Sequence, residues 1–182
     1  MIKRINLLNK EECEKIKNFI LNNEEKIKSL GPDIYPGTSE DSLTGRYSVY
    51  NFMYDLPGDI IIPKLKEIFV KDKLNFPISI QSWANIFRKN EGIKKHAHST
   101  DPKDSFICAN LFIYGDENIG TTFTINEKQV NYKNNIGEIM FFPCNLEHCV
   151  KENNGTDIRV TMAFDIHQKS MAENKKRFFT LL

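Results

Sequence analysis

Residues 106–143, "FICANLFIYGDENIGTTFTINEKQVNYKNNIGEIMFFP", decide the fold, because short apolar segments alternate there with turn residues. Glycine, asparagine and aspartate separate the segments, a spacing typical of antiparallel strands in a sandwich or barrel. Similar segments extend on both sides, so residues 77–167 are expected to form the strands. Together with helical patterns nearer the N-terminus, this predicts an α+β protein, a double-stranded β-helix (jelly roll) with N-terminal helices packed on one sheet.

The N-terminal segment has the pattern of an amphipathic helix. Asn9 is followed three residues later by Glu12, which is an asparagine form of the capping box. Apolar side chains then recur at helical spacing as far as Ile27, and Gly31 ends the pattern. A helix over residues 10–29 is therefore predicted.

The rest of residues 1–76 is expected to form a helical support for the strands. Residues 31–45 are rich in Gly, Pro, Ser and Asp, which predicts a long loop and a candidate substrate lid. Residues 46–55 alternate as a strand would. A second helix is expected within residues 57–70, with a late start because of Pro63.

The bulk composition fits a single domain over residues 1–182, with residues 168–182 as a tail that is either a short helix or a frayed end. The 25 basic and 24 acidic residues nearly cancel, which disfavours nucleic acid and fits a small-molecule or peptide substrate better. The four cysteines contain no CxxC pair, and no apolar stretch is long enough to span a membrane or serve as a signal. These features predict a cytoplasmic protein with reduced thiols and no membrane contact, and they leave the oligomeric state open.

Two of the four histidines, His96 and His98, are separated by a single residue in "GIKKHAHSTDPKD" (92–104). On a strand, side chains two residues apart project from the same face, so the two imidazoles would lie side by side while Ala97 points away. Such a pair is suited to bind a metal. An isolated HxH motif is more often a pair of ordinary hydrogen-bonded histidines, so the rest of the chain has to decide.

A second group of candidate residues follows in "EHCVKENNGTDIRVTMAFDI" (147–166). The "NG" at 154–155 is the strongest short hairpin signal, and a turn there would place His148 opposite Thr161 on one face. Arg159 would then be a diagonal neighbour of His148, about 7–8 Å away at the backbone. A metal at His148 and a guanidinium on the same face would hold the two ends of a small dicarboxylate.

In this order of motifs the chain resembles the Fe(II)/2-oxoglutarate-dependent oxygenases, in particular their prolyl-4-hydroxylase-like branch. "LLNKEECEKIKNFI" looks like the N-terminal helix of that branch, "QSWANIFRKNEGIKKHAH" like its strand and metal motif, and "ANLFIYGDENIGTTFTI" like the next strand and glycine turn. "NIGEIMFFPCNLEHCV" and "DIRVT" look like the strand with the distal histidine and the RxS/T element. The resemblance covers most of the chain and implies Fe(II), the co-substrate 2-oxoglutarate and O2.

The resemblance also implies roles for single residues. It makes His96 and His148 iron ligands, Arg159 the anchor of the far carboxylate of 2-oxoglutarate, and Thr161 the hydroxyl partner of that carboxylate. The expected reaction is hydroxylation of a C–H bond in a peptidyl residue, such as proline, or in a small metabolite, with release of succinate and CO2. The sequence selects no prime substrate.

The chain departs from the family pattern at His98, where the HxD motif has a carboxylate. Because some similar relatives carry HxH, His98 is expected to be the third ligand of the metal. Asp101 is the rival carboxylate, although a loop residue five positions on lacks the same-face relationship. A His98 that points away would make the site similar to halogenases, in which the missing carboxylate leaves room for halide.

A second departure is Phe87, which stands where the branch often has a tyrosine that bonds 2-oxoglutarate. Trp83, Asn85 and Phe87 alternate on one face of the predicted strand, so Asn85 is expected to supply that polar contact or to be a buried structural residue. Asn110 lies in an apolar segment, where a polar group needs a partner. It is expected to contact the co-substrate or the surroundings of the metal, or to bond to the backbone.

Two other classes of function stay open. One is a three-histidine dioxygenase of cupin type that acts without 2-oxoglutarate, against which Arg159 and Thr161 argue, since that chemistry needs no co-substrate anchor. The other is a jelly-roll binding protein without iron chemistry, against which the retention of the three histidines argues.

Overall fold

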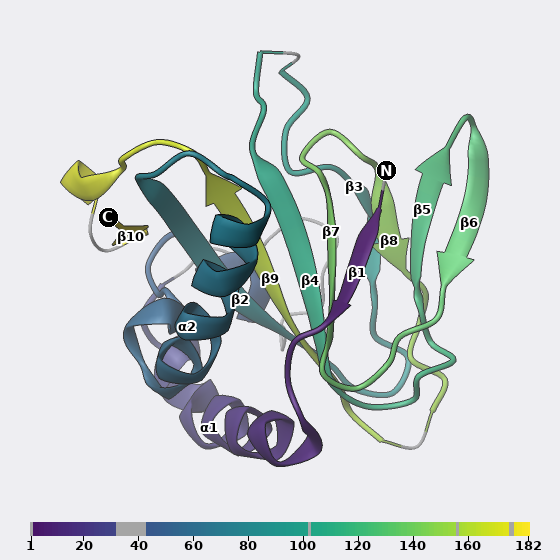
Figure 1. The fold of residues 1–182 in the computed structure, drawn as a ribbon. Coiled ribbons are helices and arrows are strands. Elements are labelled where there is room, and N and C mark those ends of the chain that lie inside the picture. The colour runs from purple at the N-terminus through teal and green to yellow at the C-terminus, as the bar shows by residue number, and fades with distance from the viewer. Residues whose placement is uncertain (1, 32–42, 102, 156, 175–176) are drawn as a thin grey trace.

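A computed structural model describes residues 2–31, 43–101, 103–155, 157–174 and 177–182. Its strands form two antiparallel sheets that face each other across a cavity, with two helices outside the larger sheet (Figure 1). The larger sheet has the strand order β1 (Lys3–Asn6), β7 (Glu138–Pro143), β4 (Ile107–Tyr114), β9 (Arg159–His167), β2 (Ile78–Phe87) and β10 (Phe179–Leu181). The smaller sheet has the order β3 (Ile93–His96), β8 (His148–Val150), β5 (Thr121–Ile125) and β6 (Lys128–Tyr132). The predicted α+β double-stranded β-helix is confirmed.

The first helix, α1 (Lys10–Lys28), forms where the sequence predicts it. The Asn9 side chain accepts a hydrogen bond from the Glu12 N–H at 2.9 Å, and the Glu12 carboxylate accepts one from the Asn9 N–H at 2.9 Å. The capping box is therefore complete at both bonds. Ile16 and Ile20 are fully buried in the main core, and burial of such a side chain contributes roughly 1.5–3 kcal/mol.

The second helix, α2 (Leu56–Lys71), begins earlier than predicted. Pro57 lies in the first turn, where a missing N–H is tolerated. Pro63 lies inside the helix on its exposed side, so it does not delay the start. Ile61 and Leu65 are fully buried on the opposite side, and this packing outweighs the backbone hydrogen bond that proline removes.

The strand predicted over residues 46–55 is not formed. The structure has two short 3-10 helices here, η1 (Leu43–Arg46) and η2 (Phe52–Tyr54), with a turn between them. Asn51 holds the segment in place, because its side-chain amide donates to the Ile80 carbonyl at 2.9 Å. The Asn51 side-chain oxygen also accepts from the Met53 N–H at 3.0 Å, and local bonds of this kind compete with strand pairing, which alternation alone does not take into account.

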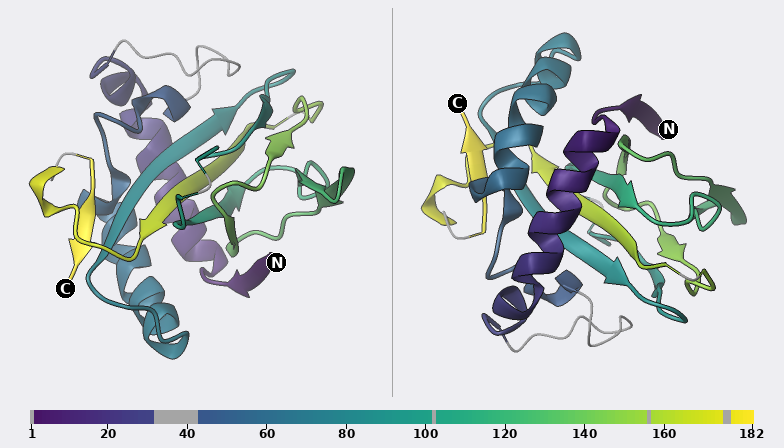
Figure 2. Two further views of the ribbon diagram at one scale, coloured as in Figure 1. Left: turned by 90° about the horizontal axis from the view of Figure 1, so that it is seen from above. Right: turned by 90° about the horizontal axis from the view of Figure 1, so that it is seen from below.

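The two faces of the larger sheet have different roles, and Figure 2 shows α1 crossing one of them. On β9, Val160 and Met162 belong to the main core on the helical side. Arg159 and Thr161 alternate with them and line the cavity between the sheets. The strand period of two therefore separates the residues that stabilise the fold from those that form the site.

The predicted hairpin between His148 and Thr161 is absent. β8 pairs with β3 and β5 in the smaller sheet, whereas β9 pairs with β2 and β4 in the larger one. The segment between them crosses from sheet to sheet and is held by Asn153. The Asn153 amide donates to the carbonyls of Phe87 at 2.9 Å and Asp157 at 2.8 Å, and these side-chain bonds take the place of a hairpin ladder.

Two predicted segments lie at the margins of the fold. Of the expected loop 31–45, residues 32–42 fall outside the described part of the chain. The tail 168–182 contains a short 3-10 helix, η3 (Ala172–Asn174), and then β10, which adds a strand to the edge of the larger sheet. β1 extends the same sheet at its other edge, also outside the expected strand region. Neither helix of the described ranges combines the length and apolar character needed to cross a membrane.

Candidate metal centre

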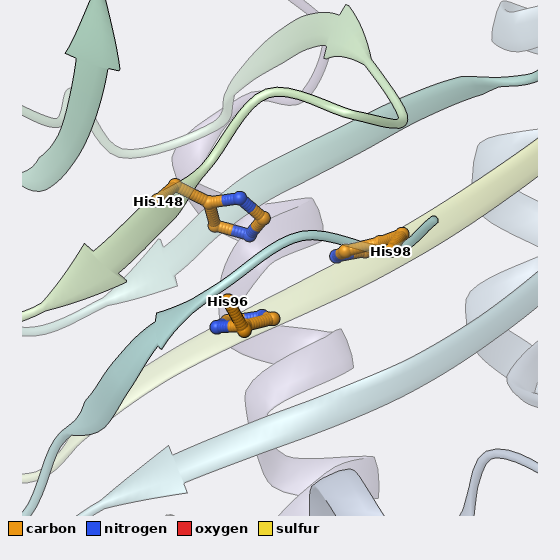
Figure 3. A group of neighbouring side chains, drawn as sticks. All are labelled: His96, His98 and His148. Atoms are coloured by element: carbon orange, nitrogen blue, oxygen red, sulfur yellow. The ribbon is translucent and has the colours of Figure 1, made fainter. Parts of the chain in front are cut away.

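Three histidines lie together between the two sheets (Figure 3). His96 ends β3 and His148 begins β8, and these two residues are direct partners in the smaller sheet. The ring centroids are 4.4 Å apart for His96 and His148, 5.2 Å for His98 and His148, and 5.7 Å for His96 and His98. One potential ligand nitrogen from each residue lies within 4.8 Å of the others. The predicted proximity is present, but strand alternation is not its cause, because β3 ends before His98.

The hydrogen bonds of His96 and His148 determine which ring nitrogen carries the proton. Nδ1 of His96 lies 2.8 Å from the Lys94 carbonyl, and Nδ1 of His148 lies 3.0 Å from the Leu146 carbonyl. Because a carbonyl oxygen only accepts, each Nδ1 carries the proton. In the neutral ring Nε2 then has the lone pair, so it is the atom available to a metal.

His98 uses a different acceptor. Its Nδ1 lies 2.5 Å from Oδ1 of Asp165, and the Cys108 thiol donates to the same oxygen at 3.3 Å. Burial, reinforced by the Asp165 charge, raises the pKa of the Cys108 thiol, which keeps it protonated and able to donate. The bond to Asp165 leaves the lone pair of the neutral His98 ring on Nε2.

The electrostatic surroundings favour neutral imidazoles. Burial lowers the pKa of His148 well below its ordinary value, and the neighbouring His96 and His98 lower it further. Burial also lowers the pKa of His96, which the bond to the Lys94 carbonyl only partly offsets. Both rings are therefore neutral near pH 7, the state that binds a metal.

Aromatic side chains enclose the histidines. The ring centroids of Phe142 and Phe123 lie 4.8 Å and 5.7 Å from the ring centroid of His148. The ring centroid of Trp83 lies 5.4 Å from that of His98. These apolar walls limit the access of water to the cavity. A low local dielectric strengthens the charged interactions that a ligand makes there.

Arg159 is the most unusual charged residue of the cavity. It is 1% exposed, and its Nε donates to the Ile119 carbonyl at 3.3 Å. Among the described residues its two terminal nitrogens have no hydrogen-bond partner. Its Cζ lies 5.6 Å from the Phe112 ring and 5.9 Å from the Phe87 ring. Burial lowers the pKa of Arg159 to about 9, so the group stays cationic at pH 7 and offers the N–H groups of both terminal nitrogens to an anion.

The polar residues expected near the co-substrate line the same cavity. Asn85 is bonded on both sides: its oxygen accepts from the Thr44 hydroxyl, and its amide donates to Oγ1 of Thr161 at 3.3 Å. Asn85 therefore orients Thr161, whose hydroxyl hydrogen is directed away from that bond. The Asn110 amide donates to Oγ1 of Thr121 at 3.2 Å. Its partner is therefore a side chain, whereas the structural role expected for Asn110 was a bond to the backbone.

The carboxylate that contacts a histidine of the site is Asp165, which the sequence analysis did not name, and not Asp101. Asp101 accepts from the Lys103 N–H at 2.9 Å in a turn, and it belongs to neither group of potential metal ligands found in the described ranges. Asp165 is the carboxylate beside the histidines. It lies on β9 at even spacing from Arg159 and Thr161, so strand alternation could have identified it.

The residues present fit a transition metal and an anionic co-substrate. Three convergent imidazoles suit Fe(II), and a buried arginine whose terminal nitrogens have no partner among the described residues suits a carboxylate. The histidines and Arg159 line one cavity, so a molecule with a chelating end and a far carboxylate would meet both.

The fold and the site together define a jelly-roll protein with a candidate three-histidine centre and an anion-binding arginine. Residues 111–165 match the family described as "Putative 2OG-Fe(II) oxygenase", a segment that contains His148, Arg159, Thr161 and Asp165. This match covers 55 of the 182 residues and agrees with the resemblance found in the sequence. No curated protein sequence matches the chain.

Solved structures of similar fold include two prolyl hydroxylases. The viral collagen prolyl hydroxylase of Paramecium bursaria chlorella virus 1 has a TM-score of 0.61 and 14% identity, over 91% of this chain and 94% of that one. The Pseudomonas putida prolyl-4-hydroxylase has a TM-score of 0.57 and 11% identity, over 93% of both chains. The non-heme monooxygenase ThoJ, solved with nickel, has a TM-score of 0.66 and 12% identity, over 90% and 71%. At these identities the likeness concerns the fold.

Proposed function

We propose that this protein belongs to the 2OG-Fe(II) oxygenases and is an Fe(II)- and 2-oxoglutarate-dependent hydroxylase. Its reaction would oxidise a C–H bond of a peptidyl residue, such as proline, or of a small metabolite, and release succinate and CO2. The observation that carries the proposal is Arg159, a buried guanidinium in the cavity that the histidines line, whose two terminal nitrogens have no hydrogen-bond partner among the described residues. An uncompensated buried charge is costly, so its retention is best explained by an anionic ligand.

The side chains divide the work of binding. His96, His98 and His148 would hold Fe(II), and Arg159 with Thr161 would hold the far carboxylate of 2-oxoglutarate. Bound Fe(II) supplies the redox chemistry that couples decarboxylation of 2-oxoglutarate to oxidation of the substrate by O2. The protein contributes position and exclusion of water.

The prime substrate would approach from a second cavity that reaches His96 and His98. Tyr47, Trp83 and Arg177 line it. The aromatic walls suit an apolar body such as a proline ring, and the guanidinium suits a polar or anionic group beside it. The lid role of residues 31–45 stays a prediction. It is supported by Thr44, which lines both cavities.

Specific residues weigh against the alternatives. A cupin-type dioxygenase has no use for a buried cation at Arg159, and a binding protein has no use for three convergent imidazoles. The halogenase alternative requires His98 to point away, whereas its ring lies with those of His96 and His148.

The test is an anaerobic titration of metal-free protein with Fe(II) and then 2-oxoglutarate, followed by the visible metal-to-ligand charge-transfer band. The wild type is compared with His98→Ala, Arg159→Met and the exposed control Lys95→Gln. A band that forms in wild type and control, weakens in Arg159→Met and is lost or shifted in His98→Ala supports the proposal and justifies a substrate screen by succinate release. Iron binding without a response to 2-oxoglutarate would favour the cupin-type enzyme, and no iron binding would contradict both enzymes.

A further inference from the structure

We propose that Asp165 is a positioning residue that supplies, through His98, the negative charge that an HxH metal site lacks. The inference rests on the proposed function, because it assumes that His98 binds the metal. It concerns a different residue and a different property, namely the affinity and redox behaviour of the metal and not the binding of 2-oxoglutarate.

The geometry separates His98 from its two neighbours. All three histidines donate through Nδ1, but His96 and His148 donate to neutral backbone carbonyls. The Nδ1 of His98 instead donates to a carboxylate, and it lies 2.5 Å from Oδ1 of Asp165. His98 is also the residue that stands where the family motif has its own carboxylate. The negative charge that the three histidines lack is therefore carried by Asp165, which is hydrogen-bonded to His98.

Burial makes this bond strong. The side chains of His98 and Asp165 are only 7% and 12% exposed, so water screens their interaction little. A carboxylate that accepts from the far nitrogen of a metal-bound imidazole fixes the tautomer and raises the basicity of the ligating nitrogen. Three neutral imidazoles leave the full charge of the metal uncompensated, and Asp165 offsets part of it.

The sheet holds Asp165 in a fixed position. Asp165 lies in the interior of the larger sheet, where Cys108 on β4 and Gln81 on β2 are its cross-strand partners. The Cys108 thiol donates to the oxygen that also accepts from His98, so the carboxylate is oriented from the sheet side as well. A group set on a central strand is positioned more precisely than one on a loop.

The first test compares wild type, Asp165→Asn and the control Glu147→Gln. Glu147 is a half-exposed acid next to His148 that bonds to Lys95, so its loss removes a nearby charge without touching a histidine nitrogen. Anaerobic titration with Co(II) gives the metal affinity, and redox titration of the iron-loaded protein without 2-oxoglutarate gives the Fe(III)/Fe(II) potential. We expect Asp165→Asn to weaken Co(II) binding roughly 10- to 100-fold and to raise the potential, with wild-type values for Glu147→Gln. A potential unchanged in Asp165→Asn overturns the inference whatever happens to the affinity.

A second measurement uses the wild type alone, so it stands even if Asp165→Asn fails to fold. In the metal-free protein, NMR of the imidazole nitrogens and their protons should place the Nδ1 proton of His98 further downfield than those of His96 and His148. Equal shifts for the three protons would overturn the inference. A wild type that binds Co(II) but ignores 2-oxoglutarate defeats the oxygenase proposal and still allows the Asp165 comparison, whereas a wild type that binds no metal defeats both.

Discussion

His148 and Arg159 lie on opposite sheets of the jelly roll and line the same cavity. β8 carries the histidine and β9 the arginine, and the connection between them crosses from one sheet to the other. The metal ligand and the anion anchor are therefore held by separate rigid layers. A bound dicarboxylate would span the space between the layers, so its binding should stabilise their association.

Replacement of Arg159 should separate ligand binding from stability. In Arg159→Met we expect 2-oxoglutarate binding to weaken roughly 100-fold or more, since each charge-assisted hydrogen bond contributes about 1.5–3 kcal/mol. The metal-free variant should be at least as stable as wild type, because a buried guanidinium with unpaired donors is removed. Thermal unfolding with and without 2-oxoglutarate and Mn(II) measures both effects. Arg177→Met, which alters the other cavity, is the control, and a large loss of ligand-free stability in Arg159→Met would contradict the prediction.

The stability of the metal-free protein should fall on acidification. Burial lowers the folded-state pKa of His96, His148 and His167, while the unfolded chain takes up protons near the ordinary value of about 6.5. The unfolded state then binds more protons below about pH 6.5, so the free energy of unfolding falls by up to about 1.4 kcal/mol per pH unit for each such histidine. Urea unfolding at pH 7.5, 6.5 and 5.5 measures the slope. The double variant His96→Gln/His148→Gln should lose less on acidification, and an equal loss would argue against this cause.

The ion pair of Glu24 on α1 with Arg88, which directly follows β2, should stabilise the fold more than the exposed pair of Glu25 with Lys28. The Glu24 carboxylate accepts from Arg88 at 2.9 Å and from Lys28 at 2.9 Å, and its side chain is 8% exposed. Burial alone raises the pKa of Glu24, but the bonds from Arg88 and Lys28 outweigh burial and lower it. We expect Glu24→Gln to cost about 1–3 kcal/mol of unfolding free energy in denaturant titration. The control Glu25→Gln, on an exposed side chain, should change stability by less than about 0.5 kcal/mol.

Replacement by alanine should affect stability differently at two asparagines of the N-terminal region. Asn9→Ala removes the cap of α1 and should cost about 1 kcal/mol. Asn18 is exposed in the middle of the same helix, where alanine has the higher helix propensity, so Asn18→Ala should be neutral or slightly stabilising. Thermal unfolding of both variants tests the assignment, and equal effects would show that the cap contributes nothing.

Local and periodic information in the sequence predicted much of this protein. The capping box at Asn9 and the end of the helix near Gly31 depend on neighbouring residues alone, and both match the structure. The spacing of the β-rich segments predicted the jelly roll, because strand alternation and turn residues are also read from neighbouring residues. The same-face relationship of Arg159 and Thr161 also held, because strand alternation is a property of the backbone and does not depend on which strand lies alongside.

Tertiary structure decided the rest, because pairing between distant segments is not encoded in any short stretch. The hairpin signal at 154–155 could not show that Asn153 bonds to Phe87 and sends the chain to the other sheet. The contact between His98 and Asp165 joins a bend after β3 to a central strand of the larger sheet, so only the packing of one sheet on the other could create it. The sequence thus determined which side chains face inward, and the stacking of the sheets determined which of them meet.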